Sequence, residues 1–359
     1  MTTPGSEDAG GEAQAMKLPR YRTGDESLDR AVAELVERTG GDEENRDQVF
    51  ELVASSLRLA RDHADRGDLK MANAALKEMR YAFHVFDPYR EERKVAIFGS
   101  ARTEPDDPLY DLARRFAAGI AERDWMVITG AGPGIMEAGI EGAGADRAFG
   151  VSIKLPFETV TPGFIADDPK LINFRYFFTR KVSFIKEADA FVLLPGGFGT
   201  LDEAFELLTL VQTGKAQPGP IVLLDVPGGT YWTAWRDFVE KELDARAYVR
   251  PHDKHLVRVT DDVETAVDEV LGFFSNYHSQ RFVQGRLVLR MHHALDDARL
   301  VELNDEFDDI VARGSIERAE ISPAELADDD HPELERIAFR FDRHGWSRLR
   351  VLIDRLNGR

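Results

Sequence analysis

Three glycine-rich turns contain the residues with the clearest capacity for chemistry. They are Gly99-Ser100-Ala101, the GAGPGIM segment at residues 130–136 and the PGGFGT segment at residues 195–200. Glycine lets the backbone approach a ligand closely, and the free N–H groups of a following helix attract phosphate. We therefore expect the turns to bind a small phosphorylated molecule. The predicted contacts are Ser100, Gly130, Gly132, Gly134, Met136, Gly196, Gly197, Gly199 and Thr200.

Two cations and a carboxylate accompany the third turn. Arg180 and Lys181 precede it, at the start of a helix expected over residues 180–188, and Glu203 follows it on the first turn of the next expected helix, residues 201–213. Helices that open at the same edge of a parallel sheet can direct such side chains into one crevice. Spacing alone leaves an alternative open, in which the cations are solvated and Glu203 complements the helix dipole.

Each glycine turn follows a short apolar run, which is the pattern of a parallel sheet with crossover helices. The runs occupy residues 95–98, 126–129, 149–153, 190–194 and 220–224, and residues 171–178 are a further candidate strand. Another helix is expected over residues 110–122. The central region, residues 93–275, is thus predicted to be an α/β domain with a Rossmann-like, doubly wound parallel sheet.

The regions on either side differ in texture. Residues 1–25 are polar and glycine-rich and are expected to form a disordered tail, and residues 26–92 have helical periodicity and are predicted to be a helical extension. Residues 276–359 suggest a small α+β appendage. Its expected order is a strand at 286–291, a helix at 298–312, strands at 316–321 and 336–341 and a helix at 346–356, with the acidic loop 328–330 between the last two strands.

Bulk composition narrows the classes of function. The net charge of −19 disfavours binding of polymeric nucleic acid, although a pocket for one phosphate needs only a few local donors. There is no cysteine, which excludes disulfides and thiol-ligated metals, and the paired histidines at 252/255 and 292/293 lack a recognisable third metal ligand. No apolar run is long enough to span a membrane, and the N-terminus lacks the apolar segment of a secretory signal. A cytoplasmic protein without a metal site is expected.

Dinucleotide binding is the first rival interpretation. A G-x-G-x-x-G motif that starts at Gly130 requires glycine where Ile135 stands, and the turn follows the second strand of the sheet rather than the first. The sequence therefore disfavours an NAD site.

The segment from Thr179 to Glu203 resembles the LONELY GUY family of nucleotide phosphoribohydrolases, whose pattern is an Arg-Lys pair followed by PGGxGTxxE. Arg180-Lys181 and residues 195–203 match that pattern, and residues 130–143 are similar to the family's second glycine motif, with Ala131 where many members have glycine. The resemblance covers residues 94–274. Phe177 stands where plant-type members have methionine before the pair, so the preferred base is left open. The family was once described as lysine decarboxylase-like, but nothing here resembles a pyridoxal-phosphate lysine site.

The resemblance implies hydrolysis of the N-glycosidic bond of nucleoside 5′-monophosphates, of the AMP or cytokinin riboside monophosphate type, without a cofactor. It implies that Arg180 and Glu203 are catalytic, that Lys181 and the glycine turns bind the substrate, and that the protein forms a homodimer or higher homo-oligomer. A non-catalytic nucleotide-binding module on the same fold, and an oligomeric scaffold, remain as alternatives from other classes.

Overall fold

The computed structural model describes residues 16–154 and 167–359. The chain divides into two compact units, residues 1–76 and 77–359, and the division falls inside a helix, α3 (Arg66–Phe86). The first fifteen residues of the predicted disordered tail lie outside the described ranges.

The first unit contains α1 (Glu26–Arg38), α2 (Arg46–Arg61) and the first half of α3. Asp25 caps α1, because its carboxylate accepts hydrogen bonds from the N–H groups of Ser27 and Leu28. Apolar residues at helical spacing form a small core between α1 and α2, namely Val32, Ala33, Val36, Phe50 and Ala54. Met16 and Leu18, which lie within the tail predicted to be disordered over residues 1–25, pack against this core, so the tail prediction was wrong for these residues.

The second unit is built on a seven-stranded sheet whose neighbouring strands are all parallel. The strand order is β4 (Leu171–Phe174), β3 (Ala148–Ile153), β2 (Met126–Thr129), β1 (Lys94–Phe98), β5 (Ala190–Leu193), β6 (Ile221–Leu224) and β7 (Arg258–Thr260). The apolar runs β1, β2, β5 and β6 are buried along their whole length, because helices cover the sheet on both faces.

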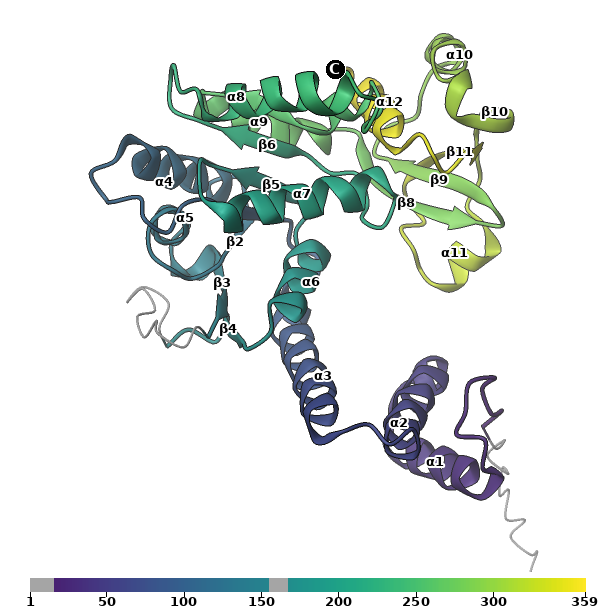
Figure 1. Cartoon of the computed structure of the whole chain (residues 1–359). Helices are drawn as coiled ribbons and strands as arrows, with labels where there is room; N and C mark the ends of the chain where they lie inside the picture. Colours follow the sequence, from purple (N-terminus) through teal and green to yellow (C-terminus); the bar gives the residue numbers. More distant parts are fainter. Residues whose placement is uncertain (1–15, 155–166) are drawn as a thin grey trace, which may run out of the picture. The chain divides into compact units, whose positions relative to one another are not determined.

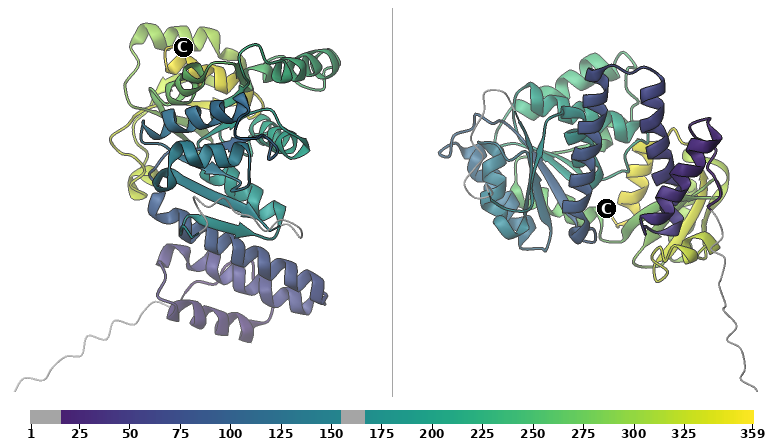
Figure 2. Two further views of the ribbon diagram at one scale, coloured as in Figure 1. Left: turned by 90° about the vertical axis from the view of Figure 1, so that its left-hand side faces the viewer. Right: turned by 90° about the horizontal axis from the view of Figure 1, so that it is seen from below.

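Helices lie on both sides of this sheet (Figures 1 and 2). One face is covered by α4 (Pro108–Ala121), α5 (Ile135–Ala143) and α9 (Val263–Phe273). The other face is covered by the second half of α3, α6 (Phe177–Glu187), α7 (Phe198–Gln212) and α8 (Tyr231–Phe238). The predicted Rossmann-like, doubly wound fold is therefore confirmed. The strand order reverses between β1 and β5, and open α/β sheets bind ligands at such a point, beyond the carboxyl ends of the strands.

Several element boundaries near the predicted site were wrong. Helix α6 begins at Phe177, so Arg180 is its fourth residue and not its first, and the candidate strand 171–178 ends at Phe174. Tyr176 provides no side-chain cap for α6, so the sequence contained no start signal there. Helix α7 begins at Phe198, which places Glu203 on its second turn. Strand β7 was missed because its three residues include an exposed arginine and form no apolar run.

The appendage is a four-stranded antiparallel sheet in the order β10 (Val311–Arg318), β11 (Glu335–Phe341), β9 (Arg286–Met291) and β8 (Tyr277–Val283). Helices α10 (Asp297–Glu306) and α12 (Trp346–Leu356) supply apolar side chains to its core, and α11 (Pro323–Ala327) lies between β10 and β11 in the chain. The predicted closing helix has the bounds of α12. The predicted helix over 298–312 was too long, since β10 already begins at Val311. Strand β8 and helix α11 were missed, because β8 is largely polar and only half-buried and α11 has one turn.

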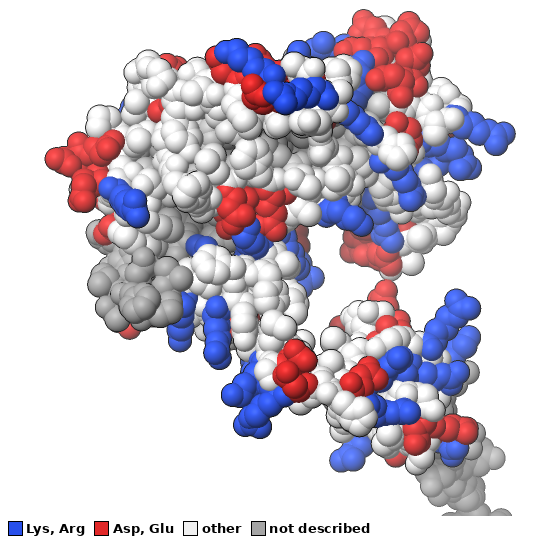
Figure 3. Space-filling view, in the orientation of Figure 1, with Lys and Arg blue, Asp and Glu red and all other residues white. Residues whose placement is uncertain are grey.

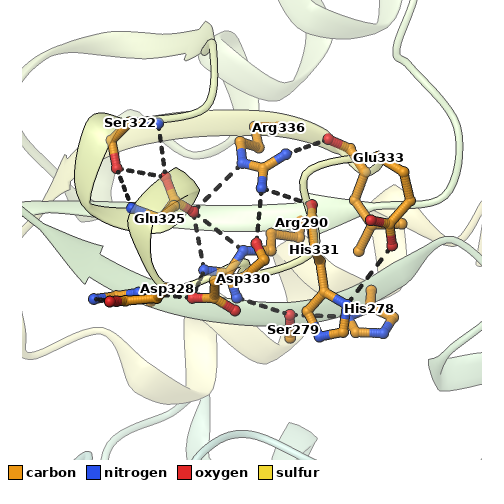
Figure 4. Close-up of polar contacts among 12 residues, drawn as sticks. His278, Ser279, Arg290, Ser322, Glu325, Asp328, Asp330, His331, Glu333 and Arg336 are labelled. Carbon is orange, nitrogen blue, oxygen red and sulfur yellow. Dashed lines mark hydrogen bonds and ion pairs between the residues drawn. The ribbon is translucent and has the colours of Figure 1, made fainter. Parts of the chain in front are cut away.

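A buried ion network holds α11 and the acidic loop on this sheet (Figure 4). The Glu325 carboxylate accepts hydrogen bonds from Arg290 and Arg336, and Arg290 also pairs with Asp330. Burial favours the protonated form of Glu325, but the hydrogen bonds from Arg290 and Ser322 outweigh it and hold its pKa at about 2. The guanidinium of Arg336 further binds the backbone carbonyl of His331 at 2.8 Å. The loop that carries His331 is thus attached to the sheet by charge-assisted bonds.

None of the helices within the described ranges is long and apolar enough to cross a membrane.

Candidate functional site

The three glycine turns meet at the carboxyl edge of the parallel sheet. The Ser100 N–H donates to the carbonyl of Pro195 at 3.2 Å, and the Ile135 N–H donates to the carbonyl of Ser100 at 3.1 Å. The turn after β1 is therefore hydrogen-bonded to the turns after β5 and β2. These contacts lie at the reversal of strand order between β1 and β5, where the fold predicts a ligand site.

Two glycines are required for this close packing. Gly134 has a φ of +69°, and a Cβ there would overlap the carbonyl oxygen of Ser100. A Cβ at Gly196 would overlap the Thr200 hydroxyl and lie 3.0 Å from the Ser100 backbone nitrogen. Larger residues at either position would separate the turns.

The backbone at the start of α7 faces open space. A Cβ added to Gly197 or Gly199 would meet no atom within 4 Å, and the Phe198 side chain between them is 94% exposed. The first N–H groups of a helix have no partner within the helix and carry a partial positive charge. This turn can therefore receive a phosphate group. Tyr231, a residue that the sequence analysis missed, supports the turn through a 2.6 Å hydrogen bond from its hydroxyl to the Gly196 carbonyl.

Arg180 is buried beneath the second glycine turn. Its Nε donates to the carbonyl of Val151 on β3 at 2.8 Å, and its guanidinium lies 5.2 Å from the centre of the Phe184 ring. It also lies against Gly130, where an added Cβ would overlap its Nη2 atom. Desolvation lowers the pKa of Arg180 and the nearby Glu203 carboxylate opposes that effect. The guanidinium is thus held in one orientation by contacts on several sides.

Glu203 is a buried carboxyl group, 8% exposed, on the second turn of α7. Burial raises its pKa, the cations Lys181 and Arg180 lower it, and the carboxylates of Glu206 and Asp202 raise it again, so that the result lies above the ordinary value. A carboxyl whose pKa is shifted by burial and by specific charged neighbours is typical of groups that take part in acid–base chemistry.

Lys181 belongs to the same group of charges. Its ammonium lies 2.5 Å from Glu206, 2.8 Å from Asp202 and 3.9 Å from Glu203. Desolvation alone would lower the pKa of Lys181, but the hydrogen bonds to Asp202 and Glu206 outweigh it and the pKa is raised. Figure 3 shows acidic side chains gathered beside a basic one where α7 lies over α6. Asp202 and Glu206 were missed from the sequence, although Glu206 lies four residues after Asp202 and three after Glu203, a spacing that brings it beside both on the helix surface.

The residues predicted for the site fall into four groups. Ser100, Gly134, Gly196 and Thr200 lie where the three turns meet. Gly130 and Gly132 lie against the Met136 side chain, and Gly130 also lies against Arg180. Lys181 and Glu203 share the carboxylate cluster on α7. Gly197 and Gly199 lie on the open side of the third turn.

A separate hollow of about 910 Å³ lies between the parallel domain and the appendage. It is lined by residues of α6 and α7, including Glu206, and by Tyr277, His278 and His331 of the appendage. Neither Arg180, Glu203 nor any residue of the three glycine turns lines it, so the hollow is a separate feature from the glycine turns. Within residues 16–154 and 167–359 no three His, Asp or Glu side chains cluster in a way that could hold a metal ion.

Fold and turns together define a class of protein, a Rossmann-like α/β protein whose glycine turns meet at the switch point of the sheet. The family model described as "Possible lysine decarboxylase" matches residues 133–270. Over 100 residues the chain is 37% identical to the cytokinin riboside 5′-monophosphate phosphoribohydrolase LOG7 of Arabidopsis thaliana, and this match covers 25% of the chain and 45% of LOG7. LOG2 of the same plant is 26% identical over 156 residues, which cover 42% of the chain and 70% of LOG2.

Among solved structures, the molybdenum cofactor carrier protein of Chlamydomonas reinhardtii superposes with a TM-score of 0.34 and 22% identity. The superposition covers 50% of the chain and 98% of the carrier protein. The fold is assigned from the strand order itself.

The chain is similar to the LONELY GUY phosphoribohydrolases of plants, and the residues that the family model matches lie in its parallel domain. The match spans less than half the length of the plant relative LOG7.

Proposed function

We propose that the protein hydrolyses the N-glycosidic bond of nucleoside 5′-monophosphates and releases a free base and ribose 5-phosphate. The observation that carries the proposal is the buried Glu203 carboxyl, coupled to the buried Arg180 guanidinium, beside a helix start with open space for a phosphate. The names of the plant relatives, cytokinin riboside 5′-monophosphate phosphoribohydrolases, support the same reaction class.

Glu203 is the group that we assign to the chemical step. As the bond between C1′ of the ribose and the base nitrogen breaks, its electron pair leaves with the base and positive charge develops on the sugar ring. An ionised carboxylate stabilises that charge and can orient, or remove a proton from, the water whose oxygen bonds to C1′. The base nitrogen ends the reaction protonated.

Arg180 is assigned a role in keeping Glu203 ionised and in contacting the ribose or the phosphate. Its positive charge lowers the pKa of Glu203 and so favours the carboxylate. Because Nε is bound to the Val151 carbonyl, the planar group is held in one orientation, in which its terminal nitrogens would donate to oxygen atoms of the substrate.

We assign binding of the substrate's 5′-phosphate to the third glycine turn. Phosphate on the amides from Gly196 to Thr200 would fix the position of the ribose above Glu203, and such positioning is a large part of catalysis. No cofactor is needed for this reaction, and a polymeric nucleic acid is disfavoured as a partner by the net charge of −19.

We further propose that the protein works as a homodimer or higher homo-oligomer. Large apolar side chains on α6 and α7 are unusually exposed for helices that flank a core, among them Phe177, Phe178, Val182 and Phe205. Apolar side chains gathered in this way are typical of surfaces that another protein covers.

The test is incubation with a panel of nucleoside 5′-monophosphates and the matching nucleosides, followed by chromatography for released base. We expect hydrolysis of a monophosphate such as AMP and far slower hydrolysis of adenosine. In the variant Glu203→Gln we expect a loss of about 100-fold or more with nucleotide binding retained, because the amide keeps the shape of the side chain but lacks its charge. Tight binding without release of any base would identify a non-catalytic nucleotide-binding module. Near-normal turnover of the variant would remove Glu203 from the mechanism.

A further inference from the structure

The carboxylate cluster around Lys181 contains two groups that the proposed reaction does not use. On α7, Glu206 lies four residues after Asp202 and three after Glu203, and all three carboxylates lie within 4 Å of the one ammonium that α6 presents to them. The Lys181 side chain is 15% exposed and that of Glu206 is 33% exposed, so the pair is partly shielded from water.

The distances rank the three partners of Lys181. Its ammonium is within hydrogen-bond distance of Glu206, at 2.5 Å, and of Asp202, at 2.8 Å, whereas Glu203 lies 3.9 Å away. At 3.9 Å the ammonium acts on Glu203 by charge alone, without a hydrogen bond. Glu206 and Asp202 therefore determine how close the cation comes to Glu203.

We propose that Glu206 is a positioning residue, which with Asp202 holds the Lys181 ammonium beside the Glu203 carboxylate and away from the substrate's 5′-phosphate. Lys181 then sets the charge of Glu203 and is not a ligand of the phosphate. The pH profile of kcat/KM can test this role only if the proposed hydrolysis takes place, whereas the contacts of Lys181 belong to the ligand-free protein and can be tested without turnover.

The positions of the Lys181 partners along α7 support these separate roles for Lys181 and the glycine turn. The open amides that can receive a phosphate belong to the first turn of α7, whereas the partners of Lys181 begin at Asp202 and extend to Glu206. At about 1.5 Å of rise per residue, Glu206, the nearest partner of the ammonium, lies about 9 Å along the helix from Thr200 and so draws the ammonium away from those amides. A phosphate that attracted Lys181 would also have to approach three carboxylates, which repel it.

The charges that face Glu203 come from two helices. Arg180 and Lys181 on α6 favour its ionised form, while Asp202 and Glu206 on α7 favour its protonated form. The variant Glu206→Gln removes a like charge and also frees Lys181 to move onto Glu203. Both changes act in the same direction and should keep Glu203 ionised to lower pH. Loss of the cation in Lys181→Met should have the opposite effect.

The kinetic experiment is the pH profile of kcat/KM for wild type, Glu206→Gln, Lys181→Met and the double variant. Because the reaction needs ionised Glu203, activity falls at low pH through the pKa of that group. We expect Glu206→Gln to exceed wild type by about three- to tenfold at the acid end of the profile, and Lys181→Met to lose activity there by a similar factor. In the Lys181→Met background, Glu206→Gln should have a smaller effect, since part of its action passes through Lys181.

Three controls separate this role from a purely structural one. Lys186→Met removes another lysine from α6, one that pairs with Glu187 at the surface, and should leave the profile unchanged. Lys181→Arg keeps the positive charge, so it should retain at low pH the activity that Lys181→Met loses. Binding of ribose 5-phosphate to Lys181→Met should stay within about threefold of wild type. A tenfold or greater loss of that affinity would make Lys181 a phosphate ligand and overturn the proposal.

A second measurement does not depend on catalysis. The carboxyl groups of the ligand-free protein can be titrated by their ¹³C NMR signals, and the Glu203 signal is the one missing from Glu203→Gln. The midpoint of the Glu203 titration should move to lower pH in Glu206→Gln and to higher pH in Lys181→Met. An unmoved Glu203 signal in Glu206→Gln would refute the positioning role. If the signal moves as expected in a protein that hydrolyses no nucleotide, the proposed function fails while the link between Glu206 and Glu203 stands.

Discussion

Gly130→Ala should disable the candidate site through the position of Arg180. The backbone of Gly130 is one that any L residue can adopt, so the substitution brings no backbone strain. The new Cβ would lie 2.5 Å from the Met136 sulfur and closer still to the Arg180 guanidinium. Since ordinary contacts of this kind are about 3.5 Å, both groups must move by about 1 Å.

The Met136 side chain can move at low cost because it is flexible, but Arg180 is held by the Val151 carbonyl and by burial. A displacement of about 1 Å in a positioning contact can lower turnover about 100-fold. Crowding of a packed region costs about 1–3 kcal/mol of stability, which lowers Tm by a few degrees. We therefore expect a large loss of turnover with a small loss of Tm.

The assay is turnover of the best nucleoside 5′-monophosphate, measured with Tm on the same preparations. Gly139→Ala is the matched control, because its Cβ would crowd Thr129 at 2.9 Å and Ile97 at 3.4 Å inside the same domain without approaching Arg180. It should keep normal turnover. If Gly130→Ala retains wild-type turnover, or if both variants lose it equally, the reasoning about Arg180 is wrong.

Two further variants test the charges in different parts of the chain. Arg180→Lys keeps a cation but loses the planar guanidinium and its Nε hydrogen bond to Val151. We expect kcat/KM to fall at least about tenfold with little change in Tm. A variant that melts at a lower temperature yet keeps its turnover would show that Arg180 has only a structural role. Glu325→Gln should destabilise the appendage at neutral pH. The pKa of Glu325 in the folded protein, about 2, lies below its ordinary value of 4.5, so the ionised carboxylate stabilises the folded state. Its contribution to the free energy of unfolding is about 3 kcal/mol; it is complete above pH 4.5 and is lost as the pH falls toward 2. Urea unfolding at several pH values should show wild type and variant converging in acid; a constant difference would contradict the assigned pKa.

The sequence by itself determined the parallel sheet and the location of its chemistry. Strands β1, β2, β5 and β6 were found because strands covered on both faces must be apolar along their whole length. Such a strand is an unbroken run of apolar residues, which can be recognised in the sequence without knowledge of its neighbours. The glycine turns were found because close backbone approach requires glycine whatever the surroundings are. Helix α12 was bounded correctly because its apolar face repeats with the period of a helix.

Only the tertiary structure decided which groups meet across elements. Arg180 is hydrogen-bonded to a backbone carbonyl of β3, and Lys181 on α6 is paired with carboxylates on α7. Glu325 is paired with arginines on β9 and β11. Spacing places a residue on a face of its own helix, but the partner that a buried charge receives depends on which element packs against that face. The polar strand β8 was missed for the same reason, since its pairing with β9, and not its own residues, makes it a strand.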